Sequence, residues 1–200
     1  MNLQDNAGLT EKLSALIDDM CRVFENVMVQ LGIDTDINDS VRTEMGLFMM
    51  YLAASDGEIS WDEAKMISGI CKMELTPSHL GNFIREKNVY SVEFEKKVPY
   101  MYKFIVDMDN LLWKMGNEFS ASDAFLATYK AIGEYLVKAD GKIADSEMKD
   151  YQIYMGMLIE YRENNYEALK NAATGFTKNG GNEDSKPIEK KDGVAAPRKG

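Results

Sequence analysis

The stretch Asp56-Gly57-Glu58-Ile59-Ser60-Trp61-Asp62-Glu63 has a counterpart 84 residues later, Asp140-Gly141-Lys142-Ile143-Ala144-Asp145-Ser146-Glu147. Both copies follow the pattern Asp-Gly-x-Ile-x-x-x-Glu, and the same shift pairs Tyr51-Leu52 with Tyr135-Leu136 and Lys65 with Lys149. A similarity that recurs at a fixed offset is typical of a duplicated unit. We therefore expect two related halves, around residues 40–90 and 120–172, each with a helix before the turn and a helix after it.

Apolar residues recur at steps of three and four through most of the chain, which is the period of helices with one buried face. This spacing predicts a long first helix that Gly32 ends. Further helices are predicted at 40–55 and over 91–116. Others are expected to begin after the capping pair Ser60 and Glu63, after Thr76-Pro77, after Ser120 and after the second turn. A short helical turn is predicted at 166–169. No segment alternates with period two for long enough to predict a strand. The expected fold is an all-α bundle of about seven helices.

Composition predicts how the chain is divided. Residues 177–200 contain almost no large apolar residue, so we expect a disordered tail after a helical domain at 1–176. The formal charge is −10, and the tail contributes six basic and four acidic side chains, which leaves −12 on residues 1–176. Such a surface attracts cations or basic partners and repels phosphate backbones, so no nucleic-acid binding is expected.

Neither a signal peptide nor a membrane-spanning helix is expected, because residues 1–5 lack a basic segment followed by an apolar run and the longest apolar stretch is 46–54. Both cysteines, Cys21 and Cys71, lie within apolar helical patterns, as buried thiols do in a reducing compartment. A cytoplasmic protein without direct membrane insertion is therefore predicted.

The repeated turn matches the second half of a calcium-binding helix-loop-helix loop, where Asp, Gly, an apolar residue and Glu recur at this spacing. The first half is missing, since Leu52, Ala54, Leu136 and Lys138 stand where oxygen ligands belong. What remains is one Asp and one Glu in each copy: Asp56, Glu63, Asp140 and Glu147. If the halves pack with their turns together, these carboxylates converge on a hard divalent cation such as calcium, magnesium or manganese. The alternative is purely structural, because turn glycines and acids near helix N-termini also act as caps.

These turns, each placed between two helices, resemble those of the TerB-like superfamily, which includes tellurite-resistance proteins and a domain of some membrane-linked J-domain co-chaperones. The resemblance covers about residues 40–160. It implies that the acidic turns gather a divalent metal, at Asp56, Glu63, Asp140 and Glu147, and that the protein belongs to a bacterial stress-response or membrane-associated system. Lys142 and Ala144 depart from the first copy, where Glu58 and Ser60 stand.

Catalytic patterns are missing from the sequence. His79 is the one histidine and begins a short polar helix, so neither a Cys-His metal site nor a histidine-based triad is expected. Asp107 and Asp109 lie two apart on a helix and are predicted to be solvated. Met49-Met50-Tyr51 and Tyr100-Met101-Tyr102 are candidates for a partner groove.

Two functions follow, and both are non-enzymatic. The first is a TerB-like, cation-linked stress-response module or membrane-system adaptor with a membrane-associated partner. The second is an acidic interaction protein without metal, either an adaptor or a toxin-neutralising immunity protein, whose charge complements a basic partner.

Overall fold

The computed structural model describes residues 3–91, 94, 96–117, 119–138 and 145–172. All regular structure in these residues is helical, which confirms the predicted all-α bundle. The helices are α1 (Leu3–Gln30), α2 (Asn38–Ala53), α3 (Trp61–Cys71), α4 (Pro77–Lys87), α6 (Tyr100–Lys114), α7 (Ala121–Leu136) and α8 (Asp145–Asn165), and 167–172 adds a short helical segment. The predicted tail at 177–200 lies outside the described residues.

Several helix ends lie where the sequence predicts them, because local chemistry decides them. Gly32 follows α1 with a φ of +76°, a left-handed conformation that favours glycine. Ser60 and Glu63 form both hydrogen bonds of a capping box at the start of α3. Thr76 accepts the backbone N–H of His79 through its side chain, and Pro77 occupies the first position of α4. His79 is exposed, as expected for a residue at a helix end.

The predicted helix over 91–116 is interrupted, because residues 96–99 are not helical. Ser91 does accept a hydrogen bond from the backbone N–H of Phe94, but α6 begins only at Tyr100, after Pro99. The proline ring disfavours a helical conformation at Val98 and leaves Pro99 without an N–H to donate. Across the molecule, the Glu44 carboxylate accepts the backbone N–H of Met101 at 2.9 Å and so caps α6 from α2.

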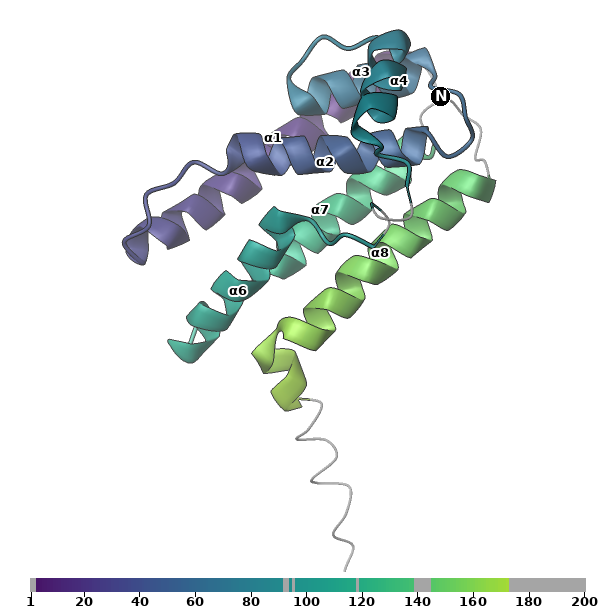
Figure 1. Cartoon of the computed structure of the whole chain (residues 1–200). Helices are drawn as coiled ribbons and strands as arrows, with labels where there is room; N and C mark the ends of the chain where they lie inside the picture. Colours follow the sequence, from purple (N-terminus) through teal and green to yellow (C-terminus); the bar gives the residue numbers. More distant parts are fainter. Residues whose placement is uncertain (1–2, 92–93, 95, 118, 139–144, 173–200) are drawn as a thin grey trace, which may run out of the picture.

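α2 and α7 form the centre of the bundle, since α2 packs against the six other helices and α7 packs against α1, α2, α6 and α8. Figure 1 shows α6, α7 and α8 running side by side, with α3 and α4 gathered near one end of α2. Close packing around α7 depends on Gly133. A Cβ atom at this position would lie 2.6 Å from the Tyr151 ring on α8 and 3.0 Å from the Phe48 ring on α2. Glycine therefore lets three helices meet at one point.

At the offset of 84, the two halves agree at some positions and differ at others, since Tyr51 is buried whereas Tyr135 is 38% exposed. α3 begins at Trp61 and α8 at Asp145, which are 84 residues apart. Within this register, Leu52 and Leu136 are both buried at the ends of α2 and α7, and Glu63 and Glu147 are both buried in the first turns of α3 and α8. The halves differ afterwards, because α3 ends at Cys71 whereas α8 continues to Asn165.

Asp109 is fully buried, so the prediction that it is solvated is wrong, whereas Asp107 is exposed as expected. The Asp109 carboxylate accepts the backbone N–H groups of Ala121 (2.7 Å) and Ser122 (2.9 Å) and the hydroxyl of Ser120 (3.0 Å). A carboxylate on α6 thus closes the N-terminal end of α7. Arg162 of α8 donates to both serine hydroxyls and pairs with Asp123, which ties all three helices together.

The two proposed partner segments belong to the core instead. Met49, Met50 and Tyr51 are buried, as are Met101 and Tyr102. Only Tyr100, of the six residues in these segments, is exposed. In the described ranges, no helix combines the length and the apolar character that crossing a bilayer requires.

Candidate metal centre

The first acidic turn is built by short-range hydrogen bonds. The Asp56 carboxylate accepts the backbone N–H of Glu58 at 2.8 Å, and Gly57 adopts a φ of +87°. The chain thereby reverses within a few residues after α2 and reaches Ser60, where α3 is capped. Asp56 itself remains exposed to solvent.

Glu63 is the buried acid of this turn, with 5% of its surface exposed. One of its carboxylate oxygens, Oε2, accepts the backbone N–H of Ser60 at 2.7 Å, and its own backbone N–H donates to the Ser60 hydroxyl at 3.1 Å. The capping box therefore holds the side chain in place and directs it back over the start of α3. This is the structural role that the sequence predicts for Glu63.

The acids described next to the second turn lie on α8. Glu147 lies in the first turn of that helix and is 6% exposed. Asp150 follows three residues later, is also buried, and accepts the Tyr90 hydroxyl at 3.0 Å. Asp150 was not among the predicted site residues, although its spacing of three from Glu147 places the two on one helix face. A search for acids at i+3 from the repeated Glu would have found it.

Glu63 and Glu147 come close enough for their charges to interact, although they lie on different halves of the chain. The pKa of Glu63 is raised from 4.5 to about 7, mainly by burial and also by the negative charges of Glu147 and Asp56, against the opposing effect of the hydrogen bonds from Ser60. Two buried acids that repel each other are a common feature of functional sites, because a bound ligand can relieve the repulsion.

The structure thus relates three of the four predicted residues. Asp56, Glu63 and Glu147 interact electrostatically, whereas Asp140 lies outside the described residues. Within the part of the chain that is described, no group of three or more His, Cys, Asp and Glu side chains is arranged closely enough to hold a metal ion.

The available groups suit a hard cation in their chemistry. Carboxylate and hydroxyl oxygens are the ligands that calcium, magnesium and manganese prefer. Besides the carboxylates, the hydroxyl of Ser55, next to Asp56, is buried and has no hydrogen-bond partner among the described residues. A buried hydroxyl without a partner costs free energy, and a cation or its bound water would satisfy it.

No protein-family model, curated protein or solved structure matches this chain.

Proposed function

We propose that this protein is a non-enzymatic, TerB-like helical module that binds a divalent cation between its two acidic turns. The supporting observation is the electrostatic interaction of Glu63 and Glu147, two buried acids at equivalent positions of the repeat. Helix caps alone account for Glu63 in its own turn, but they do not require two such acids to approach each other from separate halves.

Glu63 and Glu147 would hold the cation, and Asp56 and Asp140 would add negative charge around it. The cation would supply positive charge that removes the repulsion between the two buried carboxylates. Because one acid stands on α3 and the other on α8, binding would join the two halves and stabilise them together. In a stress-response or membrane-associated system, such a module would report the cation by changing its stability and the presentation of its surface to a protein partner.

Calorimetric titration of the purified protein with calcium, magnesium and manganese, together with melting at increasing ion concentration, tests this proposal. Binding should raise stability in proportion to the logarithm of free ion concentration. Glu63→Gln and Glu147→Gln should each abolish the gain. Glu160→Gln, which neutralises an exposed acid further along α8, should retain it. Unchanged melting of the parent protein with millimolar ions would reject the cation proposal.

The second candidate is an acidic interaction protein without metal, such as an adaptor or a toxin-neutralising immunity protein. The charge of −12 on residues 1–176 favours it. Salt-sensitive binding of a basic protein, unaffected by chelators and by Glu63→Gln, would support this candidate over the first.

A further inference from the structure

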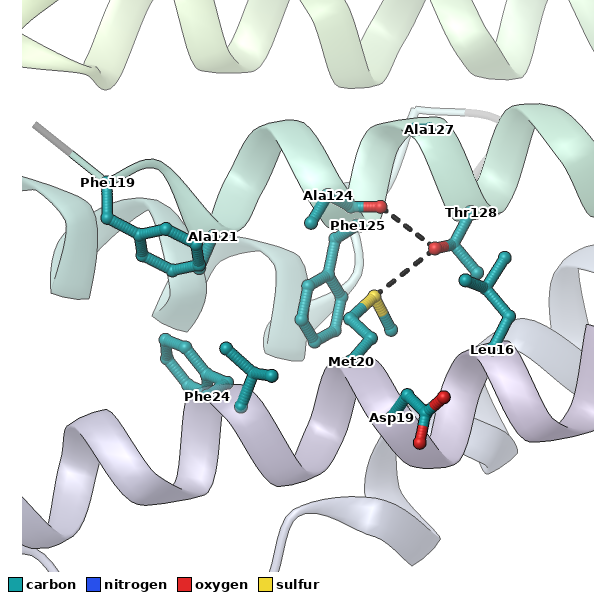
Figure 2. Close-up of a pocket in the computed structure, with 11 residues that line it drawn as sticks. Leu16, Asp19, Met20, Phe24, Phe119, Ala121, Ala124, Phe125, Ala127 and Thr128 are labelled. Carbon is teal, nitrogen blue, oxygen red and sulfur yellow. Dashed lines mark hydrogen bonds between the residues drawn. The ribbon is translucent and has the colours of Figure 1, made fainter.

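An apolar groove of about 410 Å³ lies between α1 and α7. Met20 of α1 faces Thr128 of α7, and Phe24 faces Phe125 with ring centroids 6.1 Å apart, so the two helices run antiparallel (Figure 2). These pairs form the floor. Figure 2 shows Phe119 at the end of the groove where Phe24 and Phe125 meet, and Leu16 at the other end.

The walls of the groove are exposed and apolar. On α1, Leu16 is 44% exposed and Val23 is 50% exposed, while α7 presents the exposed alanines Ala124 and Ala127. Thr128 turns its hydroxyl to the Ala124 carbonyl oxygen at 2.8 Å, so its polar group is satisfied within α7. Exposed apolar surface of this kind, between two rigid helices, is typical of an interaction site.

The shape of the groove fits a helix. Leu16 and Phe24 are eight residues apart on α1, so at a helical rise of 1.5 Å per residue the groove is about 12 Å long. This length accommodates about two turns of an incoming helix. Small side chains on one wall let the backbone of a partner helix approach closely, and apolar residues at i, i+3, i+4 and i+7 would then reach the floor.

Charge decides which helix fits. α1 and α7 together carry seven acidic and three basic side chains, and residues 1–176 carry −12 in all. Among the residues that line the groove, Asp19 is the ionisable one. A second copy of this chain would bring the same large negative charge and be repelled, and so would an anionic membrane. A helix with a basic polar face would be attracted.

We propose that the α1/α7 groove is the docking site for an amphipathic helix of a partner protein, with apolar anchors in the groove and lysine or arginine along its rim. The site lies on the first half of α7, whereas the first acidic turn follows α2 and the second follows the end of α7. This inference goes beyond the cation proposal and does not depend on it.

The test uses two synthetic amphipathic peptides that share one leucine stripe and differ only in having lysines or glutamates on the polar face. The lysine peptide should bind the full chain in calorimetry, and its affinity should fall as salt is raised, while the glutamate peptide should bind at least about tenfold more weakly. Val23→Lys on one wall and Ala127→Lys on the other should each weaken binding of the lysine peptide at least about tenfold.

Val29→Lys is the matched control. Val29 is on the same helix as Val23 and is 60% exposed, but it does not line the groove. The lysine substitution adds the same charge at either position. Binding by the Val29→Lys variant should therefore stay within about twofold of the parent. All three positions are exposed, and circular dichroism would verify that each variant retains its helices.

Failure of the lysine peptide to bind, or binding that survives both Val23→Lys and Ala127→Lys, would overturn the proposal. So would a concentration-dependent dimer in sedimentation that Val23→Lys dissociates, since the occupant would then be a second copy. Binding to phosphatidylglycerol vesicles that Val23→Lys abolishes would assign the groove to a membrane instead. None of these readouts uses a metal ion, so the outcome is separate from that of the cation titration.

Discussion

Glu63 is a buried acid whose proton affinity differs between the folded and unfolded states. Its pKa is about 7 in the folded protein, against an ordinary value of 4.5. Between these pH values the folded protein keeps a proton that the unfolded chain releases. The contribution of Glu63 to the free energy of unfolding is therefore fully present below pH 4.5 and is lost as the pH rises through 7.

In buffer without divalent ions, we expect Glu63 to lower the free energy of unfolding by on the order of 3 kcal/mol across this pH window. Chemical denaturation between pH 4.5 and 7.5 measures the effect. Glu63→Gln should flatten the profile, whereas Glu58→Gln, at an exposed position in the same turn, should keep the slope of the parent. Equal slopes for the parent and Glu63→Gln would show that this carboxyl group does not titrate in the window.

Asp107 and Asp109 provide a second comparison between single residues. Asn at position 109 would retain one acceptor oxygen but turn an NH2 group toward the N–H donors of Ala121 or Ser122, in a site without exposure. Asp109→Asn should therefore cost about 3 kcal/mol of stability. Asp107→Asn, on the exposed side of the same helix, should change stability by less than about 0.5 kcal/mol. Equal effects in denaturant titrations would contradict the assigned role of Asp109.

At the scale of elements, two glycines in the middle of helices should respond in opposite ways to alanine. Gly133→Ala places a Cβ atom against the Tyr151 and Phe48 rings, so it should destabilise the protein by about 1 to 3 kcal/mol despite alanine's better helix propensity. Gly156 in α8 has nothing within 4 Å of such an atom, and Gly156→Ala should stabilise by about 0.5 to 1 kcal/mol. Thermal melting of both variants checks the pair. A stabilised Gly133→Ala would mean that the rings move aside freely.

The helix boundaries also indicate what a sequence can predict. Ser60 with Glu63 and Thr76 with Pro77 were predicted correctly, because the groups that cap a helix there lie within a few residues of each other. Asp109 and Glu44 were not recognised as caps, because each closes a helix that is distant in the sequence. In the candidate site, the repeat identifies Glu63 and Glu147, but their burial and interaction depend on how α3 and α8 each pack against α2.

At the scale of the whole molecule, the two halves share one core. α7 buries its faces against α2 of the first half and against α1, which precedes both halves, as well as against α8. We expect residues 117–172, expressed alone, to show no cooperative thermal transition by circular dichroism, while the full chain melts in a single transition. A cooperative transition in the isolated segment would show that the second half is an independent folding unit.

The cap that Asp109 provides bears on modularity. The helix that opens the second half has its first amides closed by a carboxylate that belongs to neither repeat, since Asp109 precedes residue 120. Grafting residues 120–172 onto another scaffold would carry this helix away from the group that completes it. A transplanted segment that keeps the N-terminal cap of α7 must include Asp109. It therefore begins at Tyr100, with the whole of α6, and not at Ser120.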